Sequence, residues 1–94
     1  MTQIITEQDF YLHLEWQNEN SRGKKLSCND AVIKNLTIPE GEYQDVFFQN
    51  TKIANSVFEN VIFAKSSFHQ ITVENTRFFY SNFHSCDFNN STFR

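Results

Sequence analysis

Large apolar residues return at every fifth position between Val46 and Arg94, and most of them are phenylalanine. A period of five fits neither the 3.6-residue period of an α-helix nor the two-residue period of a strand, so this stretch is a repeat array. A small or aliphatic residue stands two positions before each large one. The large positions are Phe48, Ile53, Phe58, Phe63, Phe68, Val73, Phe78, Phe83, Phe88 and Phe93.

The same register continues backwards to Leu26 through further large positions. A backbone that turns a corner after every five residues points one large and one small side chain inward on each side. With about twenty residues per coil, residues twenty apart lie above one another at the spacing of paired strands, about 4.8 Å. We therefore expect four columns: Cys28, Phe48, Phe68 and Phe88; Ile33, Ile53, Val73 and Phe93; Ile38, Phe58 and Phe78; Tyr43, Phe63 and Phe83.

Polar residues with short side chains mark the ends of many units. Asparagine tolerates left-handed backbone and therefore suits a corner. Serine and threonine at the small positions can bond to nearby backbone at the corners. The asparagines predicted to stand at corners are Asn35, Asn50, Asn55, Asn60, Asn75 and Asn90.

The units centred on Phe68, Phe83 and Phe88 resemble the pentapeptide repeat family, whose unit has a small residue, a polar one, a central Leu or Phe, and two more polar ones. The resemblance covers roughly residues 26–94. It implies an all-β solenoid, a right-handed quadrilateral β-helix of about 3.5 coils. The first two units, and Pro39 with Gly41, depart most from the pattern, so we expect the first coil to deviate most.

Residues 1–25 lie outside the array and are expected to cap its first coil, because an open β-helix end offers unpaired edges. Thr6 followed by Asp9 reads as a helix start, and Phe10 and Leu14 then share one helical face. The strict alternation from Phe10 to Trp16 is also typical of a half-buried strand. We favour the helix, partly because members of the family often carry a short leader with His and Trp.

The chain stops at Arg94, partway through a coil, with the aromatic columns still running. An uncovered floor of aromatic rings is an apolar patch of the kind that marks an interface. The prediction is a homodimer through the C-terminal end, or a partner that covers it; a terminus folded over the floor is the alternative. The floor residues are Phe78, Phe83, Phe88 and Phe93.

The stacking scheme also places acidic and apolar residues together on the outer surface. Aromatic anchors carry interface energy and charges steer encounter, so this edge is a candidate protein-binding patch. An ordinary solvated face is the alternative. The candidate residues are Glu40, Glu42, Asp45 and Glu59, with Ile62, Phe79 and Tyr80 exposed below them.

Length and composition predict one compact, soluble domain. The chain has 94 residues and a formal charge of −3, which argues against a nucleic-acid-binding surface. No apolar run approaches a membrane span and no signal-peptide core is present, so we expect a cytoplasmic protein. Cys28 and Cys86 fall about 14 Å apart in the stacking scheme, too far for a disulfide; both are expected to fill the core.

Catalysis finds little support in the sequence. His13, His69 and His84 are scattered, and none has a nucleophile or carboxylate in a triad relation. The two glycines are far apart, so no phosphate-binding loop is present. A phenylalanine-filled stack leaves no space for a substrate. We expect no enzyme activity, no cofactor and no metal site.

The function expected from the resemblance is that of a DNA mimic. Some pentapeptide repeat proteins occupy the DNA-binding cleft of a target, and gyrase-protecting proteins of this kind are longer than this chain. A small acidic form resembles inhibitors of restriction or CRISPR effectors, which compete for a Lys/Arg channel. The rival hypothesis is a scaffold or interaction module that binds through apolar surface. Either way the expected partner is a protein, not nucleic acid or membrane.

Overall fold

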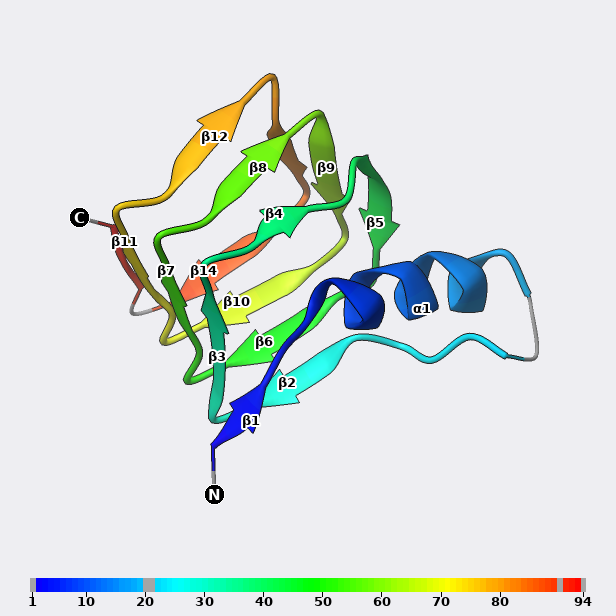
Figure 1. Ribbon diagram of the computed structural model, residues 1–94, viewed down its shortest axis with the longest axis horizontal. Coiled ribbons are helices and arrows are strands. Elements are labelled where there is room, and N and C mark those ends of the chain that lie inside the picture. Colours follow the sequence, from blue (N-terminus) through cyan, green and yellow to red (C-terminus); the bar gives the residue numbers. More distant parts are fainter. Residues whose placement is uncertain (1, 20–21, 90, 94) are drawn as a thin grey trace.

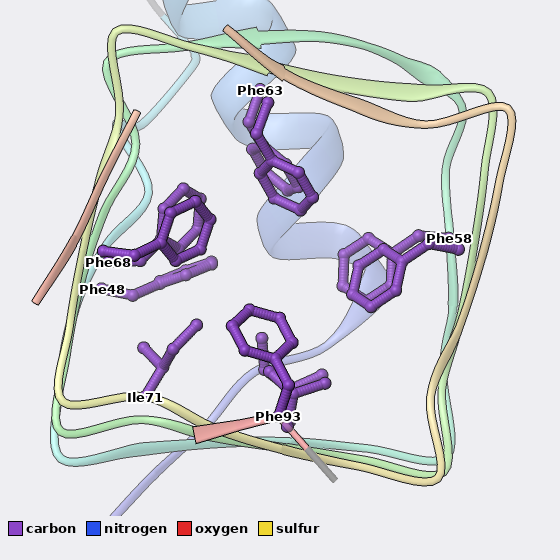
Figure 2. A pocket seen from close by; sticks show the side chains of 11 residues that line it. Phe48, Phe58, Phe63, Phe68, Ile71 and Phe93 are labelled. Atoms are coloured by element: carbon purple, nitrogen blue, oxygen red, sulfur yellow. The ribbon is translucent and has the colours of Figure 1, made fainter. Parts of the chain in front are cut away.

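The computed structural model describes residues 2–19, 22–89 and 91–93, which form a parallel β-solenoid behind one N-terminal helix (Figure 1). Seen along its axis, the chain traces a square (Figure 2). From β2 onwards, each strand pairs in parallel with the strand one coil away, twenty residues along the chain. The expected all-β solenoid with a short N-terminal helix is confirmed.

Each side of the square is one parallel sheet. The first sheet contains, in spatial order, β1 (Gln3–Ile4), β3 (Ala31–Lys34), β7 (Lys52–Ala54), β11 (Thr72–Glu74) and β15 (Thr92–Phe93). The second contains β2 (Ser27–Asn29), β6 (Phe47–Gln49), β10 (Ser67–His69) and β14 (Asp87–Asn89). The third contains β4 (Thr37–Ile38), β8 (Val57–Glu59) and β12 (Arg77–Phe79). The fourth contains β5 (Gly41–Gln44), β9 (Val61–Ala64) and β13 (Asn82–His84).

The four predicted columns of inward side chains are confirmed by the strand register. Phe48 and Phe88 are both Cα partners of Phe68, and Phe63 pairs in the same way with Tyr43 and Phe83. The other two columns follow the same spacing. The rings of the middle coil are almost completely buried and point toward the axis (Figure 2). Burial of this apolar area is the main favourable contribution to folding.

Left-handed backbone stands at the corners, as predicted. The φ angles lie between 46° and 57° at Asn35, Asn50, Asn55, Asn60 and Asn75. Asn90, the sixth predicted corner, lies outside the described residues. The same conformation also occurs where the residue type did not predict it, with φ angles of 51° to 52° at Lys65, Tyr80 and Ser85. The stacked coils therefore impose this geometry on residues that do not prefer it.

Hydroxyl groups at the small positions join adjacent coils. Ser66 Oγ donates to the carbonyl of Ala64 at 3.0 Å and accepts from the N–H of Val46 at 3.0 Å. Ser56 makes the equivalent pair of bonds with Ala54 and Leu36. These bonds satisfy backbone groups that are buried between coils and could not reach water.

The first coil departs from the regular pattern between Pro39 and Gly41, as expected. Gly41 has a φ of 153°, a conformation that side-chain-bearing residues rarely adopt. A Cβ atom there would lie 3.3 Å from Cδ2 of Leu14, which belongs to the helix. The corner thus lacks a side chain where the helix packs closely against the coil.

The helix α1 (Glu7–Gln17) lies across the N-terminal end of the solenoid (Figures 1 and 2). It begins with the predicted capping box, in which the Asp9 carboxylate accepts from the Thr6 N–H at 2.8 Å. Phe10 is buried against Tyr43, with 5.6 Å between ring centroids. The strand alternative is therefore wrong. The short strand β1, which the sequence did not suggest, pairs with β3 and covers its free edge.

Candidate partner-binding surface

A groove lies between α1 and the side of the solenoid formed by β4 and β8. Its volume is about 290 Å³. Three carboxylates line it, from Glu7 on the helix and from Glu40 and Glu59 on successive coils. Tyr11 stands beside them with half of its surface exposed (50%). The remaining lining residues are Thr37, Ile38 and Pro39. No lysine or arginine is among the lining residues that the structure describes.

The structure divides the predicted acidic patch into two parts. Glu40 and Glu59 line the groove, whereas Glu42 lies on β5, around the corner of the square. Asp45, beyond Glu42, forms an ion pair with Lys25 at 3.4 Å. Because that charge already has a partner, the groove, with three carboxylates and no cation among its described lining residues, is the more acidic part of the predicted patch.

The apolar residues predicted below the acidic edge take different positions. Phe79 is exposed, and it neighbours Glu59 as its Cα partner on β8. Tyr80 follows at the corner and is the most exposed large hydrophobic residue of the described chain, at 85%. Ile62 is half buried. Its Cα partners on the adjacent strands are Glu42 and Asn82.

The helix contributes two lining residues of the groove that the predicted patch did not include. Glu7 and Tyr11 belong to the segment that was interpreted only as a cap. They lie four residues apart, so a helix places them on one face. The spacing alone could have shown that Glu7 and Tyr11 share a face. Which side of the solenoid that face lies beside depends on how Phe10 and Leu14 pack against the first coil.

Polar side chains of the helix hold the cap to the first coil by hydrogen bonds to its backbone groups. The side-chain amide of Gln17 donates to the carbonyl of Glu42 and accepts from the N–H of Gln44 at 3.0 Å. His13 is completely buried; its Nε2 lies 2.7 Å from the carbonyl of Gln44, and its Nδ1 accepts from the N–H of Leu26 at 2.8 Å. Only Phe10 and Leu14 were expected from the sequence to share the buried helical face, so the burial of His13 was not predicted.

Burial controls the ionisation of the groups beneath the cap. Desolvation lowers the pKa of His13 from its ordinary 6.5, although the Gln44 carbonyl and the charge of Asp45 act in the opposite direction. Burial also raises the pKa of the Cys28 thiol to about 12. At neutral pH both groups are therefore uncharged, as their apolar surroundings require.

The aromatic floor closes the solenoid at the end opposite the helix. Phe78, Phe83 and Phe88 stack on the rings one coil above, with centroid distances of 4.8, 5.5 and 4.9 Å. Phe88 is exposed by 36% and Phe93 by 54%, whereas the other two rings are half buried. The rings thus pack against the core on the side of the coil above and expose apolar surface at the C-terminal end.

The interior offers little room for a small molecule. The space between the rings of the axis has a volume of about 10 Å³, close to that of one water-sized sphere, and its lining is wholly aromatic or aliphatic (Figure 2). His69 is half buried, with Nε2 3.5 Å from a carboxylate oxygen of Asp87. Within the described residues, no group of three or more His, Cys, Asp or Glu could hold a metal ion. Cys28 and Cys86 are both free thiols.

These features define a class of protein: a parallel β-solenoid with coils of about twenty residues, a helical cap and an acidic groove beside that cap. No helix among the described residues is both long and apolar enough to cross a bilayer. Comparisons with protein-family models, with curated proteins and with solved structures gave no match.

Proposed function

We propose that this chain is a cytoplasmic pentapeptide repeat protein that binds another protein and performs no catalysis. In this proposal it is a DNA mimic that inhibits a bacterial DNA-binding or DNA-targeting complex of the CRISPR or restriction effector type. The observation that supports this function is the groove lined by Glu7, Glu40 and Glu59, in which no lining residue is a cation. The pentapeptide period and the square coil support the family assignment.

The physical basis is competition for a basic channel. A protein that grips DNA places Lys and Arg side chains along the phosphate backbone. Arginine also stacks on aromatic faces, so the exposed ring of Tyr11 next to the carboxylates suits the same donor. The formal charge of −3 is small for a mimic, and the carboxylates of the groove therefore have to supply most of the effect.

A second candidate is an interaction module that binds through apolar surface. Phe79 and Tyr80 favour it, because two neighbouring large rings are exposed at one corner. The aromatic floor favours it too, either as a homodimer contact through the C-terminal end or as the seat of another protein. A gyrase-protecting role is a further form of the DNA-mimic hypothesis, aimed at a different DNA-binding cleft.

The experiment that separates these functions is capture from bacterial lysate on the immobilised chain. The test variant carries Glu40→Gln and Glu59→Gln, which remove two negative charges from the groove. The control carries Gln49→Lys and Thr92→Lys, which change the net charge equally at exposed positions on two other sheets. Captured proteins are identified by mass spectrometry at increasing salt and with duplex DNA added.

A DNA mimic retains a nucleic-acid-binding protein on the wild type and on the control but not on the test variant. That protein elutes steeply with salt and is displaced by duplex DNA. Retention that is indifferent to salt, to DNA and to both glutamates would refute the mimic. If that retention were instead lost on replacing Phe79 and Tyr80 by serine, the interaction module would be the correct function.

A further inference from the structure

His13 occupies an unusual position for a histidine, because both ring nitrogens are engaged in the buried junction between α1 and the first coil. Nδ1 accepts a hydrogen bond from the N–H of Leu26, so the ring proton must lie on Nε2. Nε2 then donates to the carbonyl of Gln44 at 2.7 Å. The neutral imidazole in this one tautomer satisfies both backbone groups. One belongs to Leu26, directly before β2, and the other to Gln44, at the end of β5.

A second proton on the ring is incompatible with this arrangement. The imidazolium carries a hydrogen on both nitrogens, so Nδ1 would point a donor at the N–H of Leu26. The site is completely buried, so water cannot restore the lost bond. The ring can take the proton only when α1 moves away from the coil.

The charged neighbours of His13 do not remove this conflict. Asp45, next to β5, favours the imidazolium, and Lys25, in the segment before β2, disfavours it. These two residues form an ion pair at 3.4 Å, so their effects on the ring largely offset each other. The other groups that face the ring are uncharged. They are Tyr43 on β5, at 6.1 Å between centroids, Trp16 on α1, at 5.2 Å, and the side-chain amide of Gln17, which favours the imidazolium.

We propose that His13 is a proton-operated latch that holds α1 against the first coil and thereby holds the acidic groove together. Glu7 and Tyr11 stand on the helix, whereas Glu40 and Glu59 stand on the solenoid, so the groove exists only while the helix is docked. This inference rests on the proposed function for its biological meaning. The latch itself depends only on the chemistry of His13.

The sign follows from proton linkage. The undocked helix has an ordinary histidine, and the docked helix has one with a lowered pKa, so protons favour undocking. Docking is unaffected above pH 6.5. Below it, the ratio of undocked to docked molecules rises about tenfold per pH unit, down to the pKa of the docked state. Burial of Phe10 opposes release throughout this range.

The test is amide hydrogen exchange on the isolated chain between pH 7.5 and 4.5, corrected for the intrinsic rate at each pH. The reporters are the amides of Leu26 and Gln44, whose acceptors are His13 and Gln17. The reference is the amide of Ser67, which bonds to Val46 within the core. Below pH 6.5 the protection of the reporters should fall by up to tenfold per pH unit until the pKa of the docked ring is reached, while that of Ser67 stays constant.

Two further measurements test whether the pH dependence of the reporters comes from His13. Nitrogen-15 spectra of the wild type should show His13 protonated on Nε2 alone at pH 7. His13→Gln should remove the pH dependence of the reporters, whereas His84→Gln, at an exposed position, should leave it intact. Reporters that follow Ser67 at every pH, or a His13 ring that titrates at 6.5 without loss of protection, would overturn the latch.

The latch and the proposed function fail separately. Exchange is measured without a partner, so a flat profile refutes the latch and leaves the groove as a binding surface. A working latch in a chain whose glutamate variants bind as the wild type does refutes the proposed function alone. If both stand, partner binding should weaken below pH 6.5 in the wild type and lose that dependence in His13→Gln.

Discussion

Replacement of Phe63 tests whether the stacked rings carry the stability of the solenoid. Phe63 is 1% exposed and stacks between Tyr43 and Phe83, with centroid distances of 5.6 and 5.5 Å. It also meets the edge of Phe68 at 5.3 Å. A buried Phe→Ala change costs about 3–5 kcal/mol, and each lost ring pair contributes about 0.5–1.5 kcal/mol beyond burial. We therefore expect Phe63→Ala to cost about 4 kcal/mol or more.

The matched control is Phe93→Ala, in the C-terminal strand β15. Phe93 is half exposed and meets Phe88 at 5.8 Å, so its loss should cost only about 1 kcal/mol. Urea unfolding, followed by the fluorescence of Trp16, measures both free energies at an unchanged m-value. If Phe63→Ala is unfolded without denaturant, Phe63→Leu serves in its place. Equal costs at the two positions would refute the view that the core is one continuous aromatic stack.

Three further substitutions test single features of the coils. Ser66→Ala leaves the buried N–H of Val46 without an acceptor and should cost about 1–3 kcal/mol in urea unfolding; no loss would mean that the hydroxyl bridge is dispensable. Gly41→Ala strains a φ of 153° and crowds Leu14, so we expect a loss of about 1–3 kcal/mol and a lower Tm by calorimetry. Tyr80→Asn relieves left-handed backbone at a φ of 51° and should raise the free energy of unfolding by about 0.5–1 kcal/mol; a decrease would show that the ring packs favourably at the corner.

The regular part of the fold could be predicted because one interaction repeats. A ring such as Phe68 finds the same neighbours one coil above and below, so a period of five determines the columns and the register together. The asparagine corners follow from the same period. Lys65 and Tyr80 show the limit: their left-handed backbone is set by the coils on either side and leaves no trace in residue type.

The junction between cap and coil could not be predicted from local pattern. The position of His13 depends on Leu26 and Gln44, which lie far along the chain and meet the ring only after the first coil closes. The pairing of β1 with β3 is equally non-local. Half of the groove was missed for the same reason, since Glu7 and Tyr11 acquire their neighbours only through that docking.

Because each coil takes twenty residues, the number of residues sets both the length of the solenoid and the direction in which later side chains point. Inserting twenty residues between β8 and β9 would lengthen the shaft by about 4.8 Å and return every later side chain to its original direction. Inserting five would turn everything beyond the insertion by about a quarter of a revolution. Phe79 and Tyr80 would then swing away from beneath Glu59, while the cap and the first coil stayed as they are. Insertions of whole coils thus change length alone, whereas shorter insertions also change the direction in which later side chains point.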